Sequence, residues 1–239
     1  MRPVFDPITG RVFEKRPRQS CTRCGTCCRK GGPAMHLEDK PLIERGDLHL
    51  RDLMTIRNGE PAYDNIRGET APATSDIIKI KSRQNDSACI FYDDANRACG
   101  IYRNRPLECR MLKCWDTRDI LTIYNRNRLS RFDLIGMSPE WWDLVNDHQN
   151  RCSYDDVLIF VNTAMKTGEK DAILEKKAAY AIRYDMEIRV LIRQNDRIDS
   201  EKLNFLFGRP MTDTLSSMGV RVHYRNGKPV CVITPSNPS

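Results

Sequence analysis

Hydrophobic positions in the second half of the chain recur with the spacing of an α-helix. Between Ser153 and Gly168 the apolar residues fall on one helical face, and a serine before such a run and a glycine after it are typical of a helix start and end. These apolar residues are Tyr154, Val157, Leu158, Val161 and Met165. The same spacing predicts a longer helix over residues 170–194, and Ser138-Pro139 predicts the start of another.

The first half of the chain shows short alternating stretches, which predict strands. Residues 76–82 alternate and are rich in isoleucine. Residues 88–92 and 98–102 flank a polar turn, and the predicted hairpin would bring a cysteine of each strand near the other. Residues 58–75 are rich in glycine, proline, threonine and aspartate and predict a loop, whereas residues 37–43 predict a short helix.

These patterns predict an α+β protein in two regions. Residues 1–115 would be an irregular, cysteine-rich region with short antiparallel strands, beginning with an extended, proline-containing arm over residues 1–20. Residues 116–239 would be mainly helical and end in a hairpin. Its strands are residues 220–224 and 228–233, around the turn signal Asn226-Gly227. Because the first region has few large apolar residues, we expect the two regions to pack on each other.

Composition indicates a folded protein without a membrane span. Hydrophobic residues make up 40% of the 239 positions and charged residues 30%, and no apolar run approaches the roughly 20 residues that cross a bilayer. The basic stretch over residues 1–20 lacks the apolar core of a secretory signal. We therefore expect a cytoplasmic protein, in which clustered cysteines bind metals or act in catalysis. In an oxidising compartment, a disulfide framework would be the alternative.

The cysteines carry the most informative chemistry. Four of the ten occur within eight residues, in the pattern C-x2-C-x2-C-C, and four more follow in the first half of the chain. We expect these eight to be metal ligands, because thiolates bind zinc and iron–sulfur clusters strongly. They are Cys21, Cys24, Cys27, Cys28, Cys89, Cys99, Cys109 and Cys114.

The triple spacing favours an iron–sulfur cluster. Bacterial ferredoxin-type runs begin with C-x2-C-x2-C and recruit a distant fourth cysteine. The first three cysteines would hold three irons of a [4Fe-4S] cluster, and Cys109 or Cys114 would complete it. Cys28 directly follows Cys27, so we expect their side chains to diverge. Cys28 would then bind a second centre or remain a thiol beside the first, and either it or Cys114 is a candidate for a reactive thiol that binds no metal.

Zinc is the alternative metal. Eight cysteines divide into two tetrahedral four-cysteine sites, which would hold a core-poor region together. The formal net charge of +7 counts every cysteine as neutral. Eight thiolates around two zinc ions would add four negative charges, and four thiolates around one [4Fe-4S]²⁺ core would add two. Part of the basic excess therefore balances metal-bound sulfur and does not by itself indicate nucleic acid.

The order of several separated motifs resembles that of a known family. The run Cys21–Cys28, the later Cys89, the motif C-G-I-Y from Cys99 and the motif R-P-L-E-C-R from Arg105 resemble the CxxCxxCC cysteine-cluster family. This YkgJ-like group is described as a zinc- or iron-chelating domain, and the resemblance covers about residues 18–115.

The resemblance implies metal ligation by the cysteines that match the family motifs. These are Cys21, Cys24, Cys27, Cys28, Cys89, Cys99 and Cys109. Family members have a further cysteine beyond the R-P-x-x-C-R motif; Cys114 and Cys152 are candidates for it, and we prefer Cys114. One distant branch includes the flagellin lysine N-methylase, which is associated with an iron–sulfur cluster. The region after residue 116 carries no motif for that activity, so whether the chain is an enzyme stays open.

Other polar residues have weaker patterns. His36 lies near the cysteines and is a candidate ligand, although a surface or hydrogen-bonding histidine is the ordinary interpretation. Arg126, Arg128 and Arg131 are able to contact phosphates, but the pattern favours a solvated loop or helix end. Cys231 is expected to be a small buried residue, and Cys152 is equally consistent with that role.

Two functional hypotheses follow from the cysteines. In the first, the chain holds an iron–sulfur cluster with a redox role or a role that supports group transfer. In the second, it is a structural zinc protein that acts as a protein or nucleic-acid interaction module. The helical half is a candidate binding surface in either case. We expect a protein or redox partner, and neither nucleic acid nor a membrane.

Overall fold

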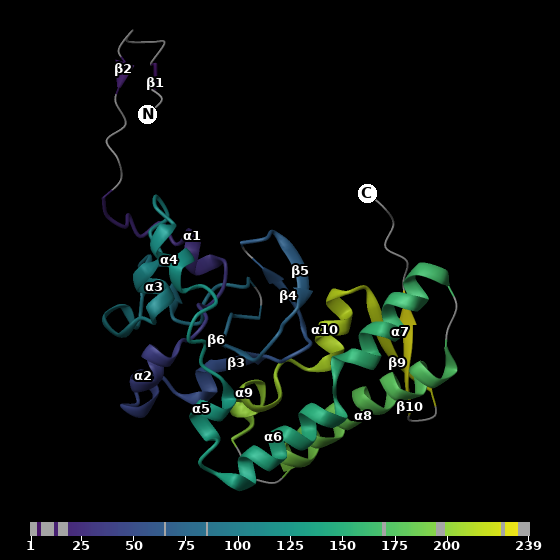
Figure 1. Cartoon of the computed structure of the whole chain (residues 1–239). Helices are drawn as coiled ribbons and strands as arrows, with labels where there is room; N and C mark the ends of the chain where they lie inside the picture. The colour runs from purple at the N-terminus through teal and green to yellow at the C-terminus, as the bar shows by residue number, and fades with distance from the viewer. Residues whose placement is uncertain are drawn as a thin grey trace.

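The predicted α+β class is confirmed by a computed structural model of the chain (Figure 1). The structure describes residues 19–64, 66–84, 86–168, 171–194, 199–225 and 228–233, together with two short strands at residues 4–5 and 12–13. The rest of the predicted arm over residues 1–20, and the predicted turn at Asn226-Gly227, lie outside the described residues.

The strands form antiparallel pairs, and each sheet in the described part of the chain has two strands. The pairs are β1 (Val4–Phe5) with β2 (Val12–Phe13), β3 (Leu53–Ile56) with β6 (Ile77–Ile80), β4 (Pro61–Asp64) with β5 (Glu69–Pro72), β7 (Tyr92–Asp93) with β8 (Ala98–Cys99), and β9 (Val220–Arg225) with β10 (Lys228–Ile233).

Short helices dominate the first half and long helices the second. The helices are α1 (Thr26–Arg29), α2 (Lys40–Glu44), α3 (Leu107–Met111), α4 (Arg118–Ile123), α5 (Arg131–Ile135), α6 (Pro139–Arg151), α7 (Tyr154–Thr167), α8 (Ala172–Gln194), α9 (Leu203–Phe207) and α10 (Met211–Ser217). Short 3₁₀ turns occur at Leu37–Asp39, Leu50–Asp52, Tyr102–Asn104 and Ser200–Lys202. None of the described helices is long and apolar enough to span a membrane.

Local signals predicted most of the long elements correctly. Helix α6 begins at Pro139, α7 ends before Gly168 at a φ of +72°, and α8, β6, β9 and β10 lie where the sequence predicts them. The predicted short helix at 37–43 is a 3₁₀ turn followed by α2. On α7, the buried face includes Phe160 and Ala164, whereas Met165 is 40% exposed. That one-residue error arises because α7 packs against both α8 and β10.

Two predictions in the first half are wrong. The predicted loop over residues 58–75 contains the hairpin of β4 and β5. Its turn depends on Asp64, whose carboxylate accepts hydrogen bonds from the backbone of Ile66 and Arg67, and its strand residues are mostly half-buried or exposed, so no hydrophobic alternation marks them. The predicted strands over 88–92 and 98–102 shrink to the two-residue strands β7 and β8, because turns and a 3₁₀ segment flank them.

A hydrophobic core joins residues from both halves of the chain. Strands β3 and β6 contribute Leu53, Ile78 and Ile80, and α9 packs on β3 with Phe205 and Phe207. Figure 1 shows α9 between the small sheet of β3 and β6 and the long helix α6. A second cluster lies among α7, α8, α10, β9 and β10. Each half contributes eight of the buried residues of the first cluster, so the two halves share one core.

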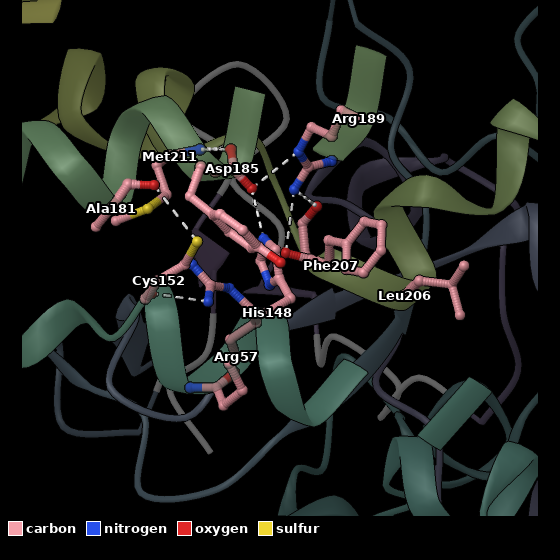
Figure 2. Close-up of polar contacts among 12 residues, drawn as sticks. Arg57, His148, Cys152, Ala181, Asp185, Arg189, Leu206, Phe207 and Met211 are labelled. Atoms are coloured by element: carbon pink, nitrogen blue, oxygen red, sulfur yellow. Dashed lines mark hydrogen bonds and ion pairs between the residues drawn. The ribbon is translucent and has the colours of Figure 1, made fainter. Parts of the chain in front are cut away.

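A buried polar network fixes the long helices to each other (Figure 2). His148 on α6 donates from Nε2 to Asp185 Oδ1 on α8, at 2.8 Å. Arg189 donates to the same oxygen at 2.9 Å, and the backbone N–H of Met211 donates to Asp185 Oδ2 at 3.0 Å. Arg189 also donates to the carbonyl of Phe207, at 3.1 Å. No sequence pattern reveals this network, because Asp and Arg are seldom fully buried unless they are paired and the partners are distant in the chain.

The network predicts a pH dependence of stability. Burial, opposed by the hydrogen bond to Asp185, lowers the pKa of His148 from 6.5 to about 4. The unfolded chain therefore binds a proton more readily between these values, and stability is lost as the pH falls through this window. From His148 alone we expect a loss of about 3 kcal/mol in the free energy of unfolding between pH 7 and pH 4.

The test is denaturant unfolding at several pH values for the wild type and for His148→Gln. The substitution should flatten the pH dependence between pH 6.5 and 4 relative to wild type, whereas His223→Gln, at an exposed position on β9, should leave the slope unchanged. Equal slopes in the wild type and His148→Gln would contradict the assignment.

Candidate metal centre

The C-x2-C-x2-C-C run folds into a tight loop that leads into α1. Gly25 precedes the helix with a φ of +77°, a left-handed conformation that glycine adopts without a steric penalty. A Cβ at this position would lie 2.0 Å from the hydroxyl of Tyr92. The loop therefore lies directly against β7, and any larger residue at position 25 would push the two apart.

Backbone and side-chain contacts hold this loop to the β7–β8 hairpin. The N–H of Cys89 donates to the carbonyl of Cys28 at 2.8 Å. Arg29 donates to Asp94 at 2.8 Å and to the carbonyl of Cys24 at 3.1 Å, and its guanidinium lies 5.2 Å from the centre of the Tyr92 ring. Two segments about sixty residues apart in the chain are thereby joined at the cysteines.

The hairpin presents two of the predicted ligands. Cys99 on β8 pairs with Tyr92 on β7, and the N–H of Tyr92 donates to the carbonyl of Cys89 at 3.0 Å. The side chain of Asp93 accepts from the backbone of Ala95 and Asn96, which forms the predicted turn. The short strands suffice to bring Cys89 and Cys99 into one neighbourhood, since Cys99 contributes to the raised pKa of Cys89.

Cys109 is positioned by the motif around it. The buried carboxylate of Asp39 accepts from the N–H of Leu107, at 2.8 Å, and so holds the first turn of α3. Glu108 accepts from the N–H of Ala34 at 2.7 Å, and its Oε1 lies 3.5 Å from Nε2 of His36. The R-P-L-E-C-R motif thus fastens α3 to the segment that follows the cysteine run.

Four of the eight sulfurs share one electrostatic neighbourhood. Burial, followed by Cys27, Cys99 and Cys89, raises the pKa of Cys28 to about 12. Burial and Cys99 also raise the pKa of Cys89. The pKa of Cys109 is raised, first by removal of its sulfur from water and then by Cys89, Cys99 and Cys28, although the residue as a whole is exposed. These raised pKa values favour the protonated thiols of Cys28, Cys89 and Cys109 when no metal is bound.

The adjacent cysteines of the run do not diverge as the sequence analysis expects. The thiols of Cys27 and Cys28 are hydrogen-bonded to each other.

A cavity of about 590 Å³ lies beside the cysteine run. Six of the eight predicted cysteines line it: Cys21, Cys24, Cys27, Cys28, Cys99 and Cys114. Cys89 is buried behind the cavity, and Cys109 does not line it. The eight cysteines therefore fall into two overlapping sets. Six line the cavity, and four lie near one another, namely Cys28, Cys89, Cys99 and Cys109. Cys28 and Cys99 belong to both sets.

The sulfurs are not drawn together around a single point. Among the described residues, no three of the eight predicted cysteines have sulfurs within 4.8 Å of one another. Four sulfurs around one zinc ion, each about 2.3 Å from it, would stand about 3.8 Å apart. The spacing of the cavity sulfurs is wider than that of a closed single-ion site.

The described residues do contain one convergent donor group, and it lies in the helical half. His148, Cys152 and Asp185 have potential ligand atoms within 4.8 Å of one another (Figure 2). Asp185 already accepts three hydrogen bonds, and the buried cations Arg57 and Arg189 lie beside the group. Because that charge opposes a further cation, we interpret the group as a structural network.

The remaining cysteines outside the metal-ligand prediction are buried. Cys152 is fully buried and donates to the carbonyl of Ala181 at 3.4 Å, and burial raises its pKa to about 12. Cys231 on β10 is 2% exposed, as expected for a small core residue. Both belong to the cluster of apolar side chains around α7 and α8.

Of the three arginines that the sequence predicts to be solvated, only Arg126 is exposed. Arg126 is exposed as expected, but Arg131 is 3% exposed and donates to Asp76 at 2.6 Å and to the carbonyl of Leu206 at 2.7 Å. Arg128 lies 3.5 Å from Glu108. The prediction of a solvated loop is therefore wrong for Arg128 and Arg131, because both have carboxylate partners from distant segments.

His36 is a buried hydrogen-bonding residue. It is 1% exposed, and its Nδ1 donates to the carbonyl of Arg126 at 2.8 Å. The hydrogen-bonding role is as expected, whereas a surface position is not. The sequence analysis did not single out Tyr92, Asp39 or Glu108. Only Glu108 carried a signal, as a member of the R-P-L-E-C-R motif.

The close approach of Gly25 to Tyr92 predicts the effect of a single added methyl group. We expect Gly25→Ala to lower both the metal content and the thermal midpoint of the purified chain. Gly46 has a similar φ of +79°, but a Cβ there meets nothing nearer than His49 Cε1 at 4.0 Å. Gly46→Ala should therefore carry only the left-handed penalty, about 1–2 kcal/mol, and keep the metal.

Metal analysis and a thermal melt of both variants separate the clash from backbone strain. Equal metal content in the two variants would show that the loop and β7 need not touch.

Comparison with known proteins agrees with the arrangement of the cysteines. No curated protein and no solved structure matches the chain. The model of one family does match, over residues 20–132, and this family is CxxCxxCC, described as a "putative zinc- or iron-chelating domain". The matched part includes all eight predicted ligands and ends before the long helices. Residues 20–132 of this chain are therefore similar to the zinc- or iron-chelating domain that the CxxCxxCC family model describes.

Proposed function

We propose that the cysteine cavity holds a [4Fe-4S] cluster whose ligands are Cys21, Cys24, Cys27 and Cys114. The observation that carries the proposal is the cavity itself, about 590 Å³ in volume and lined by six cysteines. Sites that hold a cofactor or a small molecule have volumes of about 300–1,000 Å³. A structural zinc site needs no such space, because its own four ligands close around the ion.

The spacing of the sulfurs also favours a cluster. A [4Fe-4S] cluster places a separate iron beside each cysteine, so its ligands stand farther apart than the four ligands of one ion. No three of the predicted sulfurs approach within 4.8 Å, in the part of the chain that the structure describes. Gly25 allows the backbone to wrap closely beside such a group.

The cavity distinguishes between the two candidates for the fourth ligand. Cys114 lines the cavity together with Cys21, Cys24 and Cys27, whereas Cys109 lies with Cys28, Cys89 and Cys99. We therefore assign Cys114 to the cluster. The second set of four sulfurs would then hold a separate metal; without one, the raised pKa values of Cys28, Cys89 and Cys109 favour their protonated thiols.

A cluster in this position would carry electrons or support a group transfer. The protein's own part is to hold the cluster with four thiolates and to shield it with Tyr92 and the hairpin. A reducing compartment such as the cytoplasm suits unpaired thiolates. Electron transfer would require a protein redox partner.

The second candidate function is that of a structural zinc protein. The eight cysteines are able to form two sets of four, and this number favours two zinc sites. Two sets of four, Cys21/Cys24/Cys27/Cys114 and Cys28/Cys89/Cys99/Cys109, match the ligand number of two tetrahedral zinc sites. Zinc would then stabilise the fold by about 10 kcal/mol or more per site.

Anaerobic purification with metal and sulfide analysis distinguishes the two candidates. We expect a brown protein with a broad visible absorption band and about four iron and four sulfide ions per chain. A colourless protein with about two zinc ions per chain and no sulfide, which iron and sulfide fail to convert, would contradict the cluster.

Single cysteine substitutions test which residues hold the cluster. Cys114→Ser should lower the iron and sulfide content and the visible band by about tenfold or more, because it removes a direct ligand. Cys109→Ser should keep most of the iron, since Cys109 does not line the cavity. Cys231→Ala, in the buried core of the helical half, is the matched control. Loss of iron from Cys109→Ser but not from Cys114→Ser would reverse the assignment.

A further inference from the structure

Positive side chains surround the cysteine cavity. Arg23, Lys30, Arg97 and Arg103 line it together with the sulfurs. Within the described part of the chain, no aspartate or glutamate lines it. The four cations come from two separate segments, residues 23–30 around the cysteine run and residues 97–103 from just before β8 to the following 3₁₀ turn. The chain thus places four positive charges around one cavity.

These four cations have no carboxylate partner among the described residues. The arginines just outside the cavity differ, because Arg29 and Arg83 both pair with Asp94. Arg23 instead lies 5.6 Å from the centre of the Tyr102 ring, which also lines the cavity. All four are exposed, so they are solvated and free to take a bound anion without breaking an ion pair.

Two of these arginines have a strained backbone. Arg23 has a φ of +55° and Arg97 a φ of +48°, in the left-handed region that costs a side-chain-bearing residue about 1–2 kcal/mol. Strained residues of this kind gather at binding sites, where the surrounding structure holds them in place.

The lining also contains an unsatisfied hydrogen-bonding group. Tyr92 is 5% exposed, lines the cavity, and its hydroxyl has no hydrogen-bond partner. A buried hydroxyl without a partner costs about 1–3 kcal/mol, so it marks a place where an acceptor is expected. An acceptor that also carries negative charge would satisfy Tyr92 and the four cations together.

We propose that the cavity takes up a small anion with a carboxylate or phosphate group, which Arg23, Arg97 and Arg103 hold beside the metal. The inference rests on the proposed function only in that a metal occupies the cavity. One four-thiolate centre carries two negative charges, whether it contains zinc or a [4Fe-4S]²⁺ core, and four cations exceed that charge. A concave site of about 590 Å³ suits a small molecule, because protein partners bind over broader surfaces.

The alternative is that the cations merely balance two four-thiolate centres, whose charges they would equal. The two explanations differ in what the cations do to a neutral molecule. Attraction of anions changes the rate at which charged molecules reach the cavity and leaves the rate for neutral molecules unchanged. If the cations instead neutralise the charge of the thiolates, they change how tightly the metal is bound. Their removal would then affect metal release to charged and neutral chelators equally.

The experiment measures how fast the metal-loaded chain loses metal to two chelators with the same binding atoms. One is 1,10-phenanthroline, which is neutral, and the other is its anionic disulfonated bathophenanthroline analogue. Removal of three charges in Arg23→Gln/Arg97→Gln/Arg103→Gln should slow release to the anionic chelator by about tenfold at low salt and leave release to the neutral one unchanged. The control, Arg51→Gln/Arg183→Gln/Arg221→Gln, removes three exposed charges away from the cavity and should alter neither rate.

Equal changes with both chelators would overturn the inference in favour of charge balance, and so would no change with either. Succinate and inorganic phosphate then identify the preferred group. At matched ionic strength, the better-bound anion should slow release to the anionic chelator in the wild type and not in the triple variant. Absence of protection by both anions would also contradict the inference.

The result does not depend on which metal is bound. A chain that carries zinc would disprove the iron–sulfur cluster and leave the chelator comparison valid, because both chelators remove either metal. If the chain binds neither metal, the proposed function fails separately. The same comparison then uses the free thiols, with the dianionic Ellman's reagent against neutral dithiodipyridine.

Discussion

The junction between the cysteine run and the β7–β8 hairpin is the contact on which the candidate site depends. It includes a backbone hydrogen bond from Cys89 to the carbonyl of Cys28, the close approach of Gly25 to Tyr92, and the ion pair of Arg29 with Asp94. The cavity lies where these two backbone segments meet, and both segments supply lining residues.

The rest of the fold supports this junction from two sides. Asp39 and Glu108 hold α3, and with it Cys109, against the segment after the cysteine run. Arg131 and the apolar side chains of α9 join the cysteine-rich half to the helices. In the helical half, His148, Asp185 and Arg189 fix α6 and α8. Paired polar groups thus join the two halves alongside a core cluster to which both halves contribute equally.

The sequence predicted what depends on local patterns. Helices α6, α7 and α8 follow from hydrophobic spacing and from Ser138, Ser153 and Gly168, and the eight clustered cysteines are evident without a structure. What the sequence could not reveal depends on long-range contacts. The hairpin of β4 and β5 has no apolar alternation, and the division of Cys109 and Cys114 between two sets follows from how α3 packs. The partners of Asp185 and Arg189 are likewise distant in the chain.

X-ray absorption of the metal-loaded chain at the metal edge tests the central claim most directly, because it reports the atoms around the metal itself. The account predicts iron surrounded by sulfur at about 2.3 Å together with a second shell of neighbouring iron atoms, as a cluster in the cavity requires. A zinc signal with four sulfurs at about 2.3 Å and no metal neighbour would contradict it. The cysteines would then form closed structural sites, and the cavity would have to close around the ions.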